Sequence, residues 1–344
     1  MSIMWKEIFD QPAVMKKSRE KNQIMIEKII GKINDFKPHT VVFTGRGTSD
    51  HAGQYAKYLI EIFKGLPVSL ASPSVVSDYH GRLDLSGCLV IGISQSGMTD
   101  DVIKMMQRGN QQGALTVSIT NNPESELAKE AKYHLCCEAG PELSVAATKT
   151  FATQIYLLFS LIAQWTENRE LLGLIDKIPE MVQTALSMSD QVSSMVLRCR
   201  FMDEMFILAR GINYPIAMEA ALKMNESSYT RARAFSISDF HHGPFAMVEK
   251  GTPVMLIDTD KQTRSDVKPI LDKLQSAEAE MFAITTDPEL TKSVDSCLLI
   301  PAEYDGPVSA FCVMTLVQMF GCKLAELKGE NPDAPRGLQK ITKG

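Results

Sequence analysis

The sequence lacks the features of a membrane, exported or nucleic-acid-binding protein. It contains no uninterrupted apolar run of about 20 residues, and its longest apolar segments, 155–165 and 311–320, are shorter or interrupted. Its first residues lack the basic and then apolar order of a signal peptide. The 36 basic residues are outnumbered by 41 acidic ones, and no basic stripe occurs. We therefore expect a cytoplasmic protein that binds neither a membrane nor nucleic acid.

Motifs for nucleotides and metals are also missing. The stretch Gly45-Arg46-Gly47-Thr48-Ser49-Asp50 begins like a dinucleotide fingerprint, but Asp50 stands where the third glycine belongs. No Gly-Lys-Ser or Gly-Lys-Thr occurs, which excludes a nucleotide P-loop. The pair Cys136-Cys137 lies close to His134, but no second cluster at zinc-ligand spacing accompanies it. We expect buried strand residues there, and no metal or cofactor.

The seven cysteines are an odd number and lie mostly in apolar runs, such as 87–91 and 296–299. This pattern favours reduced thiols in the core of a cytosolic protein over a disulfide framework.

Short apolar strands alternate with helical segments in the first part of the chain. The expected strands are 40–44, 67–71, 88–94 and 114–120, and the expected helices are 50–63, 100–109 and 125–131. Continuous Val, Ile and Leu strands separated by helices are typical of a parallel sheet that is covered on both faces. We expect an α/β fold.

The same order of elements recurs after a helical stretch at 175–197. We expect strands at 205–209, 233–235, 254–258 and 281–285, and helices at 215–229 and 307–327. The segment 41–47, Val-Val-Phe-Thr-Gly-Arg-Gly, is similar to 206–211, Phe-Ile-Leu-Ala-Arg-Gly. Two copies of one α/β unit explain both observations, and chance similarity of two strand-turn segments is the alternative. The 344 residues suit two domains.

A hydroxyl-rich turn follows the apolar strand that ends at Ile93. Its sequence is Ser94-Gln95-Ser96-Gly97-Met98-Thr99, and a helix comes next. Unpaired backbone N–H groups at a helix start can bind a phosphate without any lysine. The alternative is that Ser and Thr only cap the helix. The equivalent stretch of the second half, 258–264, carries acids, so we expect that copy to have lost the ligand.

Candidate acids and bases lie in the second half. On a helix, Glu219, Lys223 and Glu226 share one face, which is suited either to a catalytic group or to a solvated salt-bridge stripe. His241-His242-Gly243-Pro244 follows in a loop, where core packing is a poor use of histidine. Proton transfer between adjacent sugar carbons needs a carboxylate near C1 and C2 and an acid or base at the ring oxygen. Glu226 and His242 could supply these two roles.

Together these motifs resemble the sugar isomerase (SIS) domain family, in the tandem form found in the isomerase half of glucosamine-6-phosphate synthase. The resemblance covers nearly the whole chain from about residue 35. It rests on six motifs in the same order: Gly-Arg-Gly-Thr-Ser (45–49), Ser-Gln-Ser-Gly-Met-Thr (94–99), Val-Ala-Ala-Thr-Lys (145–149), Ala-Leu-Lys-Met-Asn-Glu (221–226), His-His-Gly-Pro (241–244) and Pro-Arg-Gly-Leu-Gln-Lys (335–340).

The resemblance implies a role for each matching residue. The substrate-binding set is Gly47, Thr48, Ser49, Ser94, Gln95, Ser96, Thr99, Val145, Ala147 and Gln339, in which 94–99 holds the phosphate and Val145 and Ala147 contribute backbone contacts. Glu226 resembles the base that moves the proton, and Lys223 is its neighbour. His242 resembles the residue that opens the sugar ring and comes from a partner subunit. Lys340 resembles a lysine that forms a Schiff base with the ketose.

The chain also departs from the synthase pattern. Ala147 and Asn225 replace a serine and a lysine, and Arg46 replaces a cysteine. No glutaminase domain precedes the first SIS unit, so we expect no glutamine-dependent synthesis. The resemblance is greatest to the SIS-type glucosamine-6-phosphate deaminases.

The resemblance implies a homodimer of two tandem SIS domains, each a flavodoxin-like three-layer sandwich. The expected segments are a helical segment at 1–34, a phosphate-binding domain at 35–170, a linker helix at 171–198, a catalytic domain at 199–328 and a tail at 329–344. The tail has no helical or strand period, so composition alone predicts a loose end, whereas the resemblance makes it an active-site lid.

The expected reaction converts glucosamine 6-phosphate and water to fructose 6-phosphate and ammonia. Galactosamine-6-phosphate deaminase, fructosamine-6-phosphate deglycase and a non-catalytic sugar-phosphate sensor remain as alternatives.

Overall fold

The computed structural model describes residues 1–340, which form two compact units. The first unit comprises Asp10–Glu142, Ala147–Pro179 and the chain from Gln339 onward. The second unit comprises Met1–Phe9, Leu143–Ala146 and Glu180–Leu338.

A parallel five-stranded sheet forms the centre of the first unit, in the order β2-β1-β3-β4-β5. Its strands are β1 (Thr40–Thr44), β2 (Val68–Leu70), β3 (Cys88–Ile93), β4 (Leu115–Thr120) and β5 (Tyr133–Cys136). All residues of β3 and β4 are buried, as expected of central strands that are covered on both faces.

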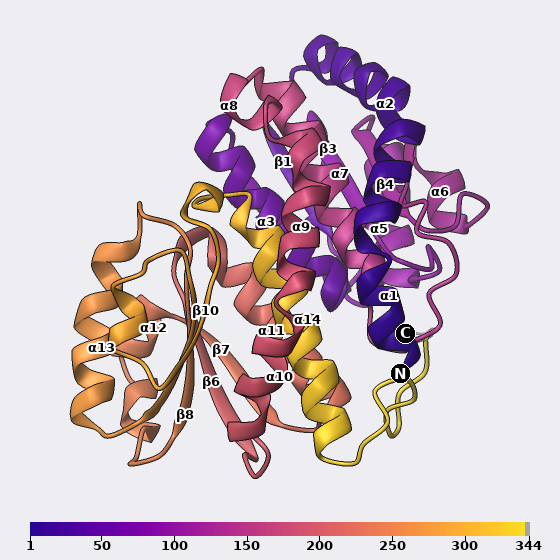
Figure 1. Cartoon of the computed structure of the whole chain (residues 1–344). Helices are drawn as coiled ribbons and strands as arrows, with labels where there is room; N and C mark the ends of the chain where they lie inside the picture. The colour runs from indigo at the N-terminus through magenta and orange to yellow at the C-terminus, as the bar shows by residue number, and fades with distance from the viewer. Residues whose placement is uncertain (341–344) are drawn as a thin grey trace. The chain divides into compact units, whose positions relative to one another are not determined.

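Helices cover both faces of this sheet (Figure 1). They are α2 (Gln11–Phe36), α3 (Thr48–Phe63), α4 (Ser74–Ser77), α5 (Asp100–Gln111), α6 (Glu126–Glu130), α7 (Lys149–Thr166) and α8 (Arg169–Leu172), followed by the 3-10 turn η1 (Ile175–Lys177). α3 and α2 pack against α7, whereas α5 packs against α4 and α6. Val90 of β3 and Met105 and Met106 of α5 are among the buried residues of the core between sheet and helix.

The second unit repeats the topology of the first. Its parallel sheet has the order β10-β9-β8-β6-β7. Read from β7, this is the order of the first sheet: the second strand in the chain lies at the edge, followed by the first, third, fourth and fifth. The strands are β6 (Glu204–Ala209), β7 (Arg231–Ser236), β8 (Pro253–Asp258), β9 (Glu280–Thr285) and β10 (Ser296–Leu299). The predicted pair of parallel-sheet α/β units is confirmed, and chance similarity of 41–47 and 206–211 is not needed to explain it.

The helices of the second unit also lie on both faces of its sheet. Figure 1 shows α12 and α13 on one face and α10, α11 and α14 on the other. The helices are α1 (Ile3–Phe9), α9 (Ile178–Ser187, which begins in the first unit), α10 (Ser189–Arg198), α11 (Tyr214–Ser227), α12 (Ile237–His241), α13 (Val267–Ser276) and α14 (Ser309–Leu327). The 3-10 turns are η2 (Gly211–Asn213), η3 (Pro244–Met247), η4 (Arg264–Asp266), η5 (Leu290–Lys292) and η6 (Ala302–Tyr304).

α14 is long and apolar enough to pass as a membrane span by length and composition. It corresponds to the helix expected at 307–327 and contains the apolar segment at 311–320. However, 83% of its 18-residue apolar stretch is buried inside the protein, as in a core helix. Its apolar character is explained by packing against α10 and α11.

The segment after α14 is anchored, contrary to the loose end that composition predicts. The Asp333 carboxylate accepts hydrogen bonds from the backbone N–H groups of Ile3 (2.8 Å) and Met4 (2.7 Å), at the start of α1. The N–H of Arg336 donates to the Tyr229 hydroxyl (2.7 Å), and the Arg336 guanidinium lies over the Tyr229 ring. Residues 341–344 of the expected tail lie outside the described residues.

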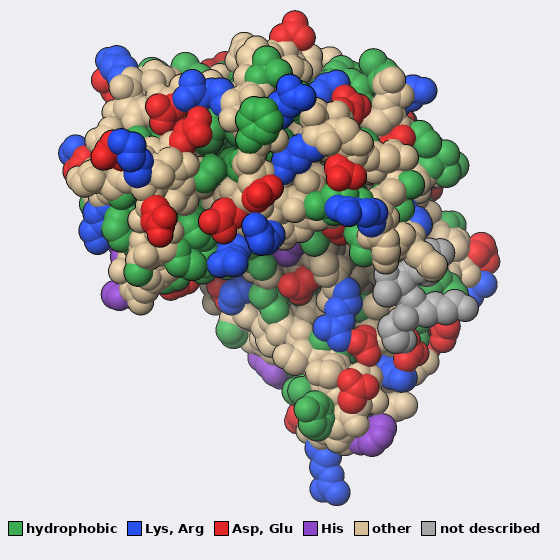
Figure 2. Space-filling model, turned by 90° about the horizontal axis from the view of Figure 1, so that it is seen from below, with side chains coloured by type: hydrophobic (Ala, Val, Ile, Leu, Met, Phe, Trp, Pro, Cys, Tyr) green, Lys and Arg blue, Asp and Glu red, His purple; other side chains and the backbone are tan. Residues whose placement is uncertain are grey.

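Acidic and basic side chains are intermingled on the face of the molecule that Figure 2 presents. The described structure contains exposed ion pairs, such as Lys250 with Glu278 (2.6 Å) and Lys292 with Glu289 (2.7 Å). Each exposed pair of this kind contributes about 0–1 kcal/mol, so the stability of the fold comes mainly from its buried cores.

Candidate functional site

The strand order of the first unit reverses between β1 and β3, which are neighbours in the sheet. Ligands of open parallel sheets bind at such a point, beyond the carboxyl ends of the strands. The turn after β1 carries Gly47, Thr48 and Ser49, and the turn after β3 carries 94–99. An ion pair between Arg46 and Asp101 joins the two turns. The structure therefore brings these predicted residues to one edge of one sheet.

The side chains of the 94–99 turn bond mainly within the turn. The Ser94 hydroxyl accepts from the N–H of Gly97 (3.1 Å) and lies 2.9 Å from the Thr99 hydroxyl. The Ser96 hydroxyl accepts from the N–H of Met98 (3.2 Å). Gln95 and Ser96 are half-buried, so both remain partly open to solvent.

Capping alone does not explain the turn. Thr99 is the N-cap residue of α5, yet its side chain makes no capping hydrogen bond within the described structure. Ser125 shows the contrast, since it caps α6 by accepting from the N–H of Ala128 (3.3 Å). Thr99 therefore leaves the first N–H groups of α5 without a side-chain cap, an arrangement suited to an anion.

Glycine is required at two positions of this site. Gly97 has a φ of 67°, and a Cβ atom there would lie 2.1 Å from the Ser125 hydroxyl. Gly47 has a φ of 53° at the N-cap of α3. Residues with side chains adopt this left-handed region only with strain, so both turns depend on glycine for their shape.

Thr48 and Ser49 begin α3 and differ in their surroundings. Thr48 is half-buried, whereas Ser49 is buried and its hydroxyl accepts from the Gln154 side chain of α7 (3.2 Å). Ser49 is thus held against the interior of the unit. Thr48 is the more accessible of the two hydroxyls.

The predicted acid-base residues of α11 do not form a solvated stripe. The Lys223 ammonium lies 2.6 Å from the Glu226 carboxylate and 3.4 Å from that of Glu219. The side chains of Glu219 and Lys223 are fully buried, and that of Glu226 is 24% exposed. Charges leave water only when they are paired or have a function. Glu226 is the member of this cluster that a ligand can reach.

The structure does not bring Glu226 and His242 of one chain together. Asn225, beside Glu226, exchanges two hydrogen bonds with the backbone of Ala232 near the start of β7 (2.9 and 3.2 Å). His242 follows α12, beyond the end of β7 at Ser236. The strand rises about 3.3 Å per residue, so about 13 Å of β7 alone separates Ala232 from Ser236. The two side chains therefore belong to opposite ends of the strand.

The two adjacent histidines have different environments. His241 lies 3.1 Å from the Lys273 ammonium, and burial, together with the charges of Lys273 and His242, lowers the pKa of His241. His242 is exposed. Of the pair, His242 is the one available to a ligand.

Lys340 is held by a carboxylate that the sequence did not reveal as a site residue. Its ammonium lies 2.7 Å from Glu142, whose side chain is fully buried in the first unit. Of the remaining predicted residues, Gln339 is exposed and Ala147 is half-buried in the first unit, whereas Val145 is half-buried in the second unit. Glu142 belongs to no helical or strand pattern in the sequence. Only its position shortly before the hydroxyls of Thr148 and Thr150 could have marked it as a site residue.

The turn of the second unit that corresponds to 94–99 follows β8 and is filled by protein charges. The Arg264 guanidinium lies 3.1 Å from Asp258 and 3.0 Å from Asp305, and it also donates to Thr286 (2.8 Å). Burial raises the pKa of Asp258, although Arg264 acts in the opposite direction. This geometry is in keeping with the expectation that the second copy does not hold the anion.

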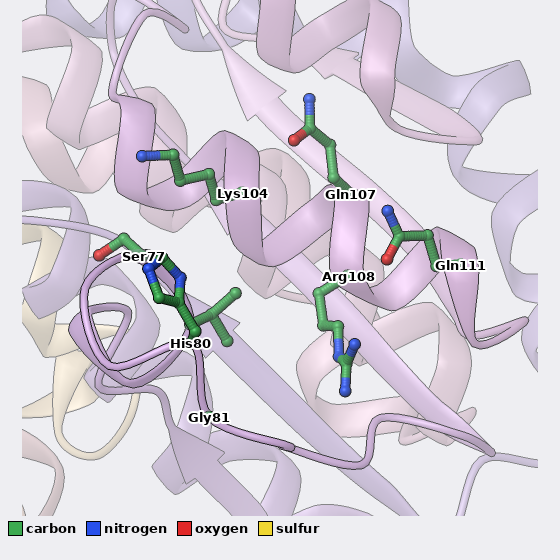
Figure 3. A pocket seen from close by; sticks show the side chains of 8 residues that line it. Ser77, His80, Gly81, Lys104, Gln107, Arg108 and Gln111 are labelled. Atoms are coloured by element: carbon green, nitrogen blue, oxygen red, sulfur yellow. The ribbon is translucent and has the colours of Figure 1, made fainter.

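A surface pocket of about 350 Å³ lies beside α5 and contains none of the predicted residues (Figure 3). Its basic groups are already engaged, since Lys104 pairs with Asp100 (2.6 Å) and Arg108 donates to the carbonyl of Leu83 (3.3 Å). We assign this pocket no role.

The fold and the two turns define a two-domain α/β protein of the type that binds small ligands at a sheet switch point. The chain belongs to the SIS domain family, whose model matches residues 36–163 and 202–325.

Comparison with known proteins gives more specific likenesses. The chain is 32% identical over 342 residues to glutamine–fructose-6-phosphate aminotransferase [isomerizing] of Aquifex aeolicus, covering 98% of this chain and 57% of that protein. The chain thus spans a little over half the length of this relative.

Two solved structures share the fold of the whole chain. The C-terminal domain of glucosamine-fructose-6-phosphate aminotransferase from Francisella tularensis has a TM-score of 0.84 at 25% identity, covering 97% of this chain and 98% of that one. Glucosamine-6-phosphate deaminase from Thermotoga maritima has a TM-score of 0.80 at 24% identity, covering 98% and 99%.

Proposed function

We propose that the protein is an amino-sugar phosphate isomerase that releases nitrogen, converting glucosamine 6-phosphate and water to fructose 6-phosphate and ammonia. The observation that carries this proposal is the hydroxyl-rich turn at the switch point of the first sheet, where Thr99 leaves the start of α5 without a side-chain cap. The family and the activity of the aminotransferase relatives favour a sugar phosphate as the anion.

In this proposal the phosphate lies on the 94–99 turn, and Gly47, Thr48 and Ser49 lie near the sugar. Backbone groups of Val145 and Ala147 and the side chain of Gln339 contact the substrate. His242 opens the ring, which exposes an aldehyde at C1. Glu226 then removes the C2 proton and delivers it to C1, with Lys223 beside it to balance its charge. The product of this transfer is an imine at C2, which water hydrolyses to the ketose and ammonia.

The separation of Glu226 and His242 supports a homodimer with a shared site. Because one chain holds these residues at opposite ends of β7, a second copy must supply His242 to a site that uses both. In a two-fold symmetric dimer each copy would then give its Glu226 to one site and its His242 to the other.

The first experiment supplies glucosamine 6-phosphate without glutamine and follows ammonia and fructose 6-phosphate. We expect equal amounts of both products from the wild type and neither from Glu226→Gln. Parallel incubations with galactosamine 6-phosphate and fructosamine 6-phosphate test the alternative substrates. If no sugar releases ammonia while Glu226→Gln binds sugar phosphate like the wild type, the protein is a sensor and the proposed reaction is wrong.

A mixing experiment tests the shared site. Glu226→Gln and His242→Ala are each expected to be inactive. When the two variants are unfolded and refolded together, half of the dimers are mixed and each mixed dimer has one complete site, so roughly a quarter of the wild-type activity should return. If the mixture stays inactive while wild type that was refolded in the same way recovers, the site is not shared.

A further inference from the structure

Glu142 is a buried carboxylate with an unusual number of donors around it. It lies in the loop between β5 and α7, and its side chain is fully buried. It accepts hydrogen bonds from the N–H of Thr148 (2.9 Å), from the N–H of Thr150 (3.0 Å) and from the Thr150 hydroxyl (2.7 Å). The Thr148 hydroxyl (3.4 Å) and the Lys340 ammonium (2.7 Å) are further donors to it.

These donors keep the carboxylate charged. Burial alone would raise the pKa of Glu142, but the Lys340 charge and the backbone hydrogen bonds lower it below its ordinary value. Both N–H donors belong to the start of α7, an 18-residue helix whose N-terminus favours a negative charge. The loop therefore offers a fixed anion, and Lys340 is drawn to it.

Glu142 is connected to the candidate phosphate turn through Asn121. The N–H of Asn121 donates to the Gln95 carbonyl (3.0 Å). The Asn121 side chain accepts from the N–H of Ala139 (3.0 Å) and donates to the carbonyl of Gly140 (2.8 Å), two residues before Glu142. The carboxyl ends of β3, β4 and β5, where these segments lie, form one edge of the sheet. The Lys340 amine is thus held at the same edge as the turn.

We propose that Glu142 is the positioning residue of Lys340, serving as the counter-ion that holds its amine at this edge and as the counter-ion of the cationic iminium that forms with a ketose carbonyl. This inference rests on the proposed function, in which Lys340 forms a Schiff base. The predicted motifs name Lys340 but contain no partner for it, and the structure supplies Glu142.

The charge balance of the step closes around the pair. The ammonium loses one proton to solvent, and the freed lone pair forms a C–N bond to C2 of the ketose. A second amine proton passes to the former carbonyl oxygen, which gives a carbinolamine. A proton from solvent then reaches the hydroxyl, which leaves as water, and the lysine remains as a cationic iminium. The Glu142 carboxylate faces one positive charge before and after the step.

The test is reductive trapping of Lys340 with fructose 6-phosphate and excess cyanoborohydride, followed by peptide mass spectrometry from pH 6.5 to 8.5. Because the amine loses its proton to solvent in every variant, the rate of imine formation should rise with pH in all of them. At each pH Glu142→Gln should be labelled about 100-fold more slowly than the wild type, because the carboxylate that holds the amine in position is gone.

Two further variants control for structure. Glu142→Asp keeps a carboxylate and should recover most of the labelling rate. Glu138→Gln removes a more exposed carboxylate that pairs with Lys17 (3.0 Å) in the same loop, and it should behave like the wild type. If Glu142→Gln traps as fast as the wild type, or Glu142→Asp traps as slowly as Glu142→Gln, Glu142 does not position the amine and the inference is wrong.

Failure of the inference can be distinguished from failure of the proposed function. If the wild type releases ammonia from glucosamine 6-phosphate but fructose 6-phosphate never labels Lys340, the deaminase stands and the role of Glu142 falls. If Lys340 is labelled at the expected relative rates in the variants but no ammonia appears, the Glu142–Lys340 pair stands and the deaminase falls.

Discussion

Replacing Lys223 by methionine should destabilise the second unit strongly. The Lys223 side chain is fully buried and lies 3.4 Å from Glu219, which is also fully buried. Removing one member of a buried ion pair leaves an uncompensated charge and costs about 3–5 kcal/mol. For a domain of this size, that loss corresponds to a fall in the melting temperature on the order of 10 °C. Scanning calorimetry of the wild type and Lys223→Met measures it.

The chain contains a matched control for burial. Lys268 and Asp272 in α13 have the same i,i+4 spacing and the same distance of 3.4 Å, but the Lys268 side chain is 81% exposed. Lys268→Met should change stability by no more than about 0.5 kcal/mol. The double variant Lys223→Met with Glu219→Gln should recover part of the loss, because the fully buried Glu219 side chain is then neutral. Equal effects of Lys223→Met and Lys268→Met would refute the reasoning.

Three further predictions concern the turn, the Glu142 carboxylate and the thiols. Gly97→Ala should raise the KM for the sugar phosphate at least tenfold, because the new Cβ meets Ser125, whereas Gly65→Ala, with a similar φ of 69° and open space, should leave KM unchanged. The wild type should have a larger free energy of unfolding than Glu142→Gln, and this difference should be constant near neutral pH. It should shrink as the pH falls below about 4.5, because the lowered pKa of Glu142 stabilises the folded state only while the group is ionised. Urea unfolding at several pH values measures the difference. Burial raises the pKa of Cys297 to about 11, so at pH 8 its labelling by a disulfide reagent, followed by mass spectrometry, should be roughly two orders of magnitude slower than that of free cysteine.

The sequence predicted the central strands but not every long helix. β3 is a continuous apolar run and β4 alternates apolar residues with Thr and Ser, and all residues of both strands are buried. α7, with 18 residues, is not among the expected helices. β10 and α13 were missed for physical reasons. β10 has only four residues and lies at a sheet edge. α13 carries Pro269 at its third position, where the missing N–H would have had no helical partner, so a residue that usually marks a break is tolerated.

The candidate site was predictable only where residue type alone carries the signal. Hydroxyls around Gly97 after an apolar strand indicate an anion turn in any sequence. Glu142 gives no such signal, because a glutamate between proline and leucine in a loop is ordinarily solvated, and its burial depends on α7 and on Lys340, almost 200 residues further along the chain. The burial of Lys223 likewise follows from the packing of α14 on α11, which the helix pattern of α11 alone does not contain.

The two units have the same strand order but different charges at the edge where the proposed anion site lies. In the first unit none of the six residues 94–99 carries a charge, and the next two residues, Asp100 and Asp101, are paired with Lys104 and Arg46. In the second unit Arg264 is already surrounded by Asp258, Asp287 and Asp305 at 3.1, 3.8 and 3.0 Å. Three carboxylates around one guanidinium leave a local excess of negative charge, which would repel a phosphate. The same sheet edge that attracts an anion in one unit should therefore reject it in the other, although the strand order is the same.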